Sequence, residues 1–126
     1  MTNQGGSWTD LADIVYLDQP VGTGFSYGNS YITSMDEIGE EFLQFMRAFL
    51  AKYPEYRARD IYIAGESYAG KYIPLFATKL LGSSDFKDIK LKSLIISNPL
   101  ASPLTQRLVT YNLAKGLNYV DGYHLG

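Results

Sequence analysis

The group of residues best suited to chemistry is the pentapeptide Gly-Glu-Ser-Tyr-Ala at 65–69. It matches the Gly-x-Ser-x-Gly nucleophile elbow, with alanine in place of the second glycine. In an elbow, a sharp strand-to-helix turn presents the serine hydroxyl, here that of Ser67, at the end of a strand. A serine hydroxyl is a weak nucleophile, and the N–H groups and positive field of the helix N-terminus would stabilise the oxyanion that its attack creates. The N–H of Tyr68 would be one of the oxyanion donors.

A structural interpretation of the same residues stays open. Ser67 could instead be the N-cap of the following helix, with Gly65 as a tight-turn residue. Pentapeptides of this kind also arise by chance. Whether the motif indicates a nucleophile therefore depends on the elements on either side of the serine.

An elbow needs a strand before the serine and a helix after it, and the sequence predicts both. Residues 60–64 are mostly apolar and β-prone, which predicts a strand. A helix is expected from about Ser67 to Leu81, with Gly82 suited to its C-terminal cap. Pro74 is expected to kink this helix or to end its first segment.

Further strands and helices alternate with this pair. Residues 12–18 predict a strand, because the continuous apolar run at 14–17 is typical of a parallel strand covered on both faces, and residues 91–97 predict another strand. A first helix is expected to begin at the capping box of residues 34–37 and to end at Pro54. The apolar side chains expected on its buried face are Ile38, Phe42, Phe45, Met46, Phe49 and Tyr53.

The order of these elements predicts an α/β fold. A third helix is expected to begin with Ser102 as N-cap and Pro103 as N1, and to end near Gly116. Strands separated by helices imply a mostly parallel sheet of about three strands within a three-layer α/β/α arrangement. Ligand sites in such sheets lie beyond the carboxyl ends of the strands. The turn at 65–70 and the glycine-rich loop at 19–30 both fall at that edge.

The glycine-rich loop has an alternative explanation. A loop of this kind after a strand can bind phosphate, but the Gly-Lys-Ser/Thr end of a P-loop is missing here. Asp18, directly before the loop, is better explained as a side chain that stabilises the turn than as a catalytic group.

Composition excludes several classes of protein. The length suits one ordinary domain, residues 1–126. There is no cysteine and only one histidine, His124, so we expect no disulfide, no metal site and no cofactor. A net charge of −2 without a basic stripe argues against a nucleic-acid partner. No apolar run approaches the roughly 20 residues that span a bilayer, and the polar first residues predict no signal peptide in this chain, so no membrane partner is expected.

Two long motifs resemble one known family. These are Tyr-Leu-Asp-Gln-Pro-Val-Gly-Thr-Gly-Phe-Ser-Tyr at 16–27 and Ile-Ala-Gly-Glu-Ser-Tyr-Ala-Gly-Lys-Tyr-Ile-Pro at 63–74. Together they resemble the serine carboxypeptidases, which have the α/β-hydrolase fold. Ser-Trp at 7–8 and Lys-Tyr-Pro-Glu-Tyr at 52–56 fit the same order, whereas residues 98–106 resemble the family's Gly-Asn-Gly…Asp-Pro segment only loosely. The resemblance covers nearly the whole chain and implies a partial α/β-hydrolase fold.

The resemblance also implies roles for individual residues. Ser67 would be the nucleophile, and Tyr68 would donate an oxyanion N–H. Gly22-Thr23-Gly24 would line the cleft near the elbow. Glu66 would help to recognise the free C-terminal carboxylate of a peptide, which needs a proton between the two carboxyl groups and so favours acid pH. From the residues alone, a solvated carboxylate at the helix start explains Glu66 equally well.

The implied activity is that of a serine-type carboxypeptidase. Such an enzyme releases C-terminal amino acids from peptides or proteins through an acyl-enzyme. A full-length parent would be expected in a vacuole, a lysosome or a secreted fluid. A relative that uses the same elbow for acyl transfer is an alternative, because both reactions share the acyl-enzyme.

A serine of this kind needs a histidine base and an acid that orients it. In the family both lie far downstream, an oxyanion segment lies upstream of Ser7-Trp8, and His124 does not occupy the position of the base. We therefore expect a fragment that is inactive alone, with the remainder of the same fold as its partner. An inactive truncated member or a peptide-binding module is the alternative.

Overall fold

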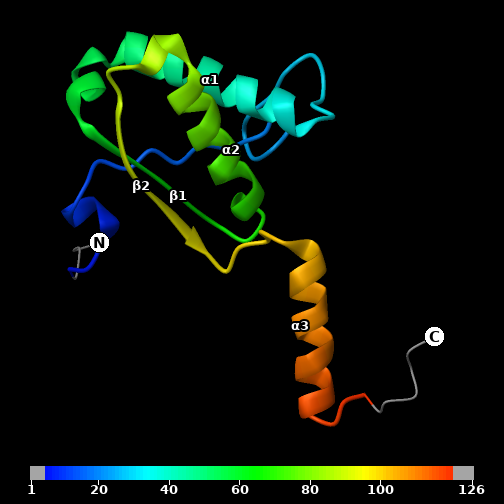
Figure 1. The fold of residues 1–126 in the computed structure, drawn as a ribbon. Helices are drawn as coiled ribbons and strands as arrows, with labels where there is room; N and C mark the ends of the chain where they lie inside the picture. The colour runs from blue at the N-terminus through cyan, green and yellow to red at the C-terminus, as the bar shows by residue number, and fades with distance from the viewer. Residues whose placement is uncertain (1–4, 121–126) are drawn as a thin grey trace. The chain divides into compact units, whose positions relative to one another are not determined.

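The computed structural model describes residues 5–120, and the chain divides into two units, Met1–Ser34 and Met35–Gly126 (Figure 1). The first contains the 3-10 helix η1. In its described residues the second contains two strands, three α-helices and two further 3-10 helices. Their bounds are η1 Trp8–Asp10, α1 Met35–Lys52, η2 Pro54–Ala58, β1 Asp60–Glu66, α2 Ala69–Gly82, η3 Ser84–Phe86, β2 Lys90–Ser97 and α3 Pro103–Gly116.

The strand expected at residues 12–18 is absent from the first unit. These residues form no strand, and Val15 and Tyr16 are 52% and 87% exposed. A strand exists only where its N–H and C=O groups pair with a neighbouring strand, and the structure gives this segment no such partner. The burial expected from the apolar pattern is therefore absent too, because both pairing and burial depend on a second segment that the pattern does not contain.

The glycine-rich loop of the first unit is closed by Asp18. Its Oδ2 accepts the N–H of Phe25 at 3.0 Å, and its backbone oxygen accepts the Ser26 hydroxyl at 2.6 Å. Gly24 has φ +56°, and a Cβ at this position would overlap the Asp18 carboxylate. The structural role expected for Asp18 is confirmed.

The second unit is built on a parallel pair of strands. β1 and β2 lie side by side and pair from Asp60 opposite Lys90 to Glu66 opposite Ser97, with one register shift between Ile61 and Tyr62 (Figure 1). α2 connects them and contacts both, as a crossover helix in an α/β fold does. The α/β class is therefore confirmed. The sheet has two strands in the described residues instead of about three, because residues 12–18 do not join it.

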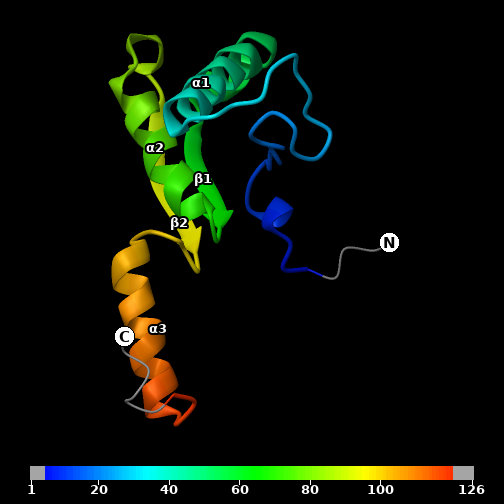
Figure 2. The same cartoon turned by 90° about the vertical axis from the view of Figure 1, so that its right-hand side faces the viewer.

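Helix α2 covers one face of this sheet (Figure 2). Exposure alternates along β1, where Ile61, Ile63 and Gly65 are half-buried and the residues between them are exposed. Tyr62 on the other face is 55% exposed. Of the three layers that the sequence predicted, the described part of this unit therefore shows the sheet and the helical layer on one of its faces.

The apolar core lies between α1 and α2. Phe42 of α1 stacks on Phe76 of α2, with ring centroids 4.2 Å apart. The expected buried face of α1 was only partly right, because Phe45 and Phe49 are half-buried while Leu43 and Leu50 are buried. The buried side chains of the core are Phe42, Leu43, Met46, Leu50, Ile73, Phe76, Ala77, Leu80 and Phe86.

The starts of α1 and α3 agree with the local sequence signals, whereas α2 departs from them. α1 begins directly after Ser34, and α3 begins at Pro103, as expected. α2 begins at Ala69 instead of Ser67, and it includes Gly82. It also continues through Pro74, so this proline does not end a first segment of the helix, and a kink there stays a prediction. Buried side chains before and after the proline hold the helix against the core, which offsets the one backbone hydrogen bond that proline removes.

Two arginines bind the segments around η3. Arg57 binds both carboxylate oxygens of Asp88 at 2.7 Å and the backbone oxygen of Asp85 at 2.5 Å. Arg47 of α1 binds the Asp85 carboxylate at 2.7 Å. The hydrogen bond from Arg57 lowers the pKa of Asp88 below its ordinary value. These contacts attach η2 and α1 to the segment between α2 and β2.

Neighbouring leucines of α2 provide a test of the core. Leu80 is 1% exposed and Leu81 is 70% exposed. Replacing Leu80 with alanine should lower the free energy of unfolding by about 2–5 kcal/mol, because it removes buried methyl groups and leaves a cavity. Leu81→Ala should change it by less than about 0.5 kcal/mol. Urea unfolding of the two variants measures the difference, and equal losses would mean that α2 does not present this face to the core.

The Arg57–Asp88 pair should make stability depend on pH. The pKa of Asp88 is lower in the folded chain than its ordinary value of 3.8, so the pair stabilises the fold above that value. This contribution is lost as the pH falls through the folded-state pKa. Asp88→Asn should therefore lower Tm at neutral pH, and the two Tm values should converge under acid conditions.

Thermal unfolding as a function of pH would measure this convergence. Asp13→Asn, which changes an exposed carboxylate of the first unit, is the matched control and should track the unmodified chain at every pH. A Tm difference for Asp88→Asn that stays constant down to acid pH would show that the ion pair is not its cause.

Candidate nucleophile elbow

Ser67 occupies the turn between β1 and α2 in a backbone conformation that serine rarely adopts. Its φ is +58°, in the left-handed region. Its N–H donates to the backbone oxygen of Ser97 at 3.0 Å. Its backbone oxygen accepts the N–H groups of Gly70 at 3.0 Å and Leu100 at 2.8 Å. The backbone of Ser67 is thus held from both sides, and its exposed side chain lies at the apex of the turn.

The helix-cap interpretation of Ser67 is not what the structure shows. The N-cap of α2 is Tyr68, in a right-handed conformation, and no side chain makes a cap hydrogen bond there. The Tyr68 backbone oxygen accepts the N–H of Lys71 at 2.9 Å. In the described residues no backbone hydrogen bond outside the regular elements uses the N–H of Tyr68, which leaves this donor available at the start of the helix.

Small residues allow the strand and the helix to meet at this turn. A Cβ on Gly65 would come within 2.6 Å of the Ala69 Cβ. A Cβ on Gly70 would come within 2.7 Å of Pro99 and within 3.0 Å of the backbone of Leu100. Gly65 and Ala69 were expected to allow this approach. Gly70 was not singled out, although it stands next to them in the sequence, because its neighbours lie about 30 residues further along the chain.

Aromatic side chains connect the elbow to the core. The Tyr68 ring meets the Tyr72 ring edge-on, with centroids 5.0 Å apart, and Tyr72 stacks on Phe76 at 6.0 Å. Burial raises the pKa of Tyr72, and the neighbouring Tyr68 adds to the shift. Since Phe76 also stacks on Phe42, a continuous row of rings runs from the turn to α1.

The remaining predicted site residues fall into two groups. Glu66 ends β1 opposite Ser97, with an exposed side chain beside the turn. Gly22, Thr23 and Gly24 belong to the first unit, whose loop is closed by a 3.0 Å bond from Gly22 N–H to the Ser26 oxygen. That these three line a cleft beside Ser67 stays a prediction. His124 lies outside the described residues.

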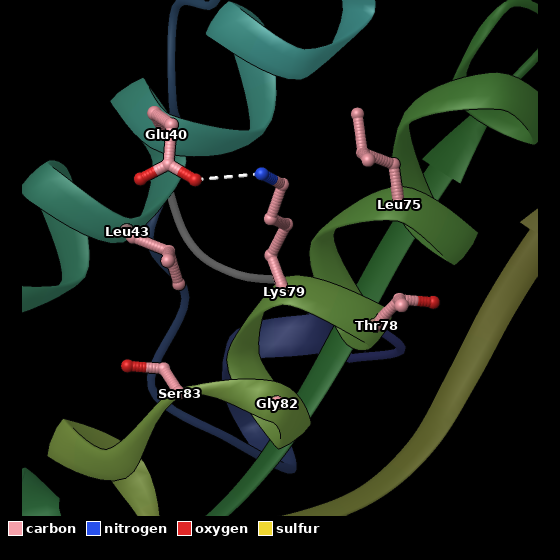
Figure 3. Close-up of a pocket in the computed structure, with 7 residues that line it drawn as sticks. All are labelled: Glu40, Leu43, Leu75, Thr78, Lys79, Gly82 and Ser83. Carbon is pink, nitrogen blue, oxygen red and sulfur yellow. Dashed lines mark hydrogen bonds and ion pairs between the residues drawn. The ribbon is translucent and has the colours of Figure 1, made fainter.

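A hollow in the described surface lies away from the elbow. It has a volume of about 320 Å³ and is lined by residues of α1, α2 and Ser83 (Figure 3). Lys79 reaches across it and binds Asp36 and Glu40, each at 2.6 Å. Hydrogen bonds to these two carboxylates raise the pKa of Lys79. The ion pairs join the two helices, and they provide no nucleophile or base for Ser67.

Metal and membrane features are also absent from the part of the chain that the structure describes. Residues 5–120 contain no cluster of three or more histidine, aspartate or glutamate side chains able to hold a metal ion. None of their helices is long and apolar enough to cross a bilayer.

A parallel strand, a left-handed serine at the turn and a helix that follows at once form the arrangement expected of a nucleophile elbow in the α/β-hydrolase class. Comparison with known proteins specifies the family. The serine carboxypeptidase family model matches residues 1–124. The chain belongs to the serine carboxypeptidase family.

Individual relatives agree with this assignment. The pheromone-processing carboxypeptidase KEX1 of Ogataea parapolymorpha is 43% identical over 88% of this chain and 18% of its own length. Carboxypeptidase Y of Komagataella phaffii is 46% identical over 79% of this chain and 19% of its own length. The crystal structure of Kex1(delta)p, a prohormone-processing carboxypeptidase from Saccharomyces cerevisiae, matches 94% of this chain with a TM-score of 0.81 and 30% identity. The chain thus spans less than a fifth of the length of these two curated relatives.

The glycines of α2 provide a test of the elbow. Gly70→Ala should destabilise the chain by about 1–3 kcal/mol, because the new methyl group would overlap the backbone of Leu100. Gly82→Ala is the matched control, since a Cβ there has no neighbour within 4 Å. The control should leave stability unchanged or raise it by up to about 1 kcal/mol. Urea unfolding of the two variants measures this difference. A Gly70→Ala variant as stable as the unmodified chain would refute the close approach of α2 to the segment at Leu100.

Proposed function

We propose that this chain carries the nucleophile portion of a serine carboxypeptidase. The observation that carries the proposal is the left-handed Ser67 at the apex of the turn between β1 and α2. In the proposed reaction the Ser67 Oγ attacks the carbonyl carbon of the last peptide bond of a substrate. Its proton passes to a base and then to the departing amino group as the C–N bond breaks. Water then releases the acyl group from Ser67.

The start of α2 supplies the electrostatic part of this proposal. The attack places negative charge on the former carbonyl oxygen, and the N–H of Tyr68 is a donor suited to bind it. The positive end of the helix dipole acts in the same direction. Glu66 would bind the free carboxylate of the substrate, with one proton shared between the two groups, so binding would be favoured at acid pH.

The base and the acid that orients it are proposed to come from elsewhere in a longer parent polypeptide. The single histidine of this sequence is His124, and the chain spans 18% of the first of these relatives. A serine without its base loses most of its activation, so we expect no turnover from the 126 residues alone. For the parent, a vacuole, a lysosome or a secreted fluid would suit an activity favoured by acid.

The experiment compares the chain with the parent polypeptide that this proposal implies. Release of a C-terminal amino acid from a blocked dipeptide is measured at about pH 5, together with labelling by a serine-directed fluorophosphonate. In the parent, Ser67→Ala should lower turnover by a factor on the order of a million. Ser84→Ala, which changes a serine at the start of η3, is the matched control and should retain activity.

Two results would contradict the proposal. A parent that remains active after Ser67→Ala would have another nucleophile. Turnover by the chain alone that Ser67→Ala abolishes would place the base within these 126 residues.

A further inference from the structure

The segment that follows β2 holds the elbow from outside the strand-to-helix turn. The N–H of Leu100 donates to the Ser67 oxygen at 2.8 Å, and the Ser97 oxygen accepts the N–H of Ser67 at 3.0 Å. Pro99 and Leu100 also pack directly against Gly70. The conformation of Ser67 therefore depends on residues 97–100 as much as on β1.

This segment has no regular structure of its own to fix it. Asn98 has φ +42°, and residues 98–102 belong to neither β2 nor α3. The expected N-cap, Ser102, occupies the cap position of α3, but its side chain makes no cap hydrogen bond and binds the Thr105 hydroxyl at 3.0 Å instead. The Ser102 side chain therefore does not accept from the N–H groups at this corner.

Gln106 supplies an acceptor at this corner, and a donor as well. Its Oε1 accepts the N–H groups of Ala101 and Ser102, both at 3.2 Å. Its Nε2 donates to the Pro99 oxygen at 2.6 Å. The backbone N–H of Gln106 donates to the Ser102 oxygen at 2.9 Å, which fixes the base of this side chain in the first turn of α3. One side chain thus closes the whole corner between β2 and α3.

We propose that Gln106 is a positioning residue for the nucleophile: it holds residues 99–102, and Leu100 in turn holds Ser67 in its left-handed conformation. The catalytic part of this inference rests on the proposed role of Ser67 as nucleophile. Glutamine suits this role because its side-chain amide carries both a hydrogen-bond donor and an acceptor. Lysine lacks the acceptor, an ionised glutamate lacks the donor, and asparagine is one methylene shorter.

Amide hydrogen exchange and backbone carbon chemical shifts of the full chain test this coupling without any assay of activity. Gln106→Ala should speed exchange of the Leu100 N–H by about tenfold, the loss expected for roughly one net hydrogen bond. The Ser67 Cα and Cβ shifts should move away from left-handed values, while amides in the middle of α1 keep their protection. Gln106→Glu, which keeps the acceptor, should give a smaller change.

Gln44→Ala is the matched control, because Gln44 is an exposed glutamine on α1. It should leave both readouts as they are in the unmodified chain. Unchanged Leu100 exchange and Ser67 shifts in Gln106→Ala would overturn the inference, and so would faster exchange of equal size throughout α1. If Gln106→Ala does not fold, Gln106→Glu carries the same comparison, and a Leu100 N–H that exchanges no faster than in the unmodified chain overturns the inference.

The parent polypeptide adds a kinetic readout. There Gln106→Ala should lower kcat several-fold with little change in KM, because it disturbs the attacking group more than the binding of substrate. A parent that stays active after Ser67→Ala would refute the proposed nucleophile. The coupling between Gln106 and Ser67 would then be judged by amide hydrogen exchange alone. Failure of the proposed nucleophile and failure of the Gln106 inference are therefore distinguishable.

Discussion

The left-handed backbone of Ser67 is the constraint on which the arrangement of the second unit depends. For a residue with a side chain this conformation costs roughly 1–2 kcal/mol relative to the right-handed one. The hydrogen bonds to Ser97, Gly70 and Leu100 offset that cost, and those to Ser97 and Leu100 need β2 and its following segment beside β1. The parallel pairing of the strands and the start of α2 are therefore both required by one residue.

Packing transfers this constraint from the turn to the helices. The rings of Tyr68, Tyr72, Phe76 and Phe42 form one row from the elbow to α1. A side chain that has to hold a reactive geometry is best supported by regular elements whose own side chains are fixed by packing. Helix α2 meets this requirement, because its buried face reaches from the row of rings to the fully buried Leu80.

Features encoded by neighbouring residues could be predicted from the sequence, and features that depend on distant contacts could not. The strand before Ser67 and the start of α3 at Pro103 follow from local patterns, and both were confirmed. The strand at 12–18 was wrong because pairing requires a partner segment. The roles of Gly70 and Gln106 were missed because each is defined by contacts with the segment after β2, which no local pattern reports.

The sheet itself supports the proposal that a longer polypeptide completes this fold. Parallel sheets in proteins are normally covered on both faces, and small sheets of two strands are marginal in water. Here α2 covers one face, whereas Tyr62 and Ile95 on the other face are 55% and 44% exposed. Because apolar and aromatic side chains on a sheet face gain free energy when they are buried, further segments of a parent enzyme would find a favourable surface here. The same segments would be the natural source of the base and acid that the elbow requires.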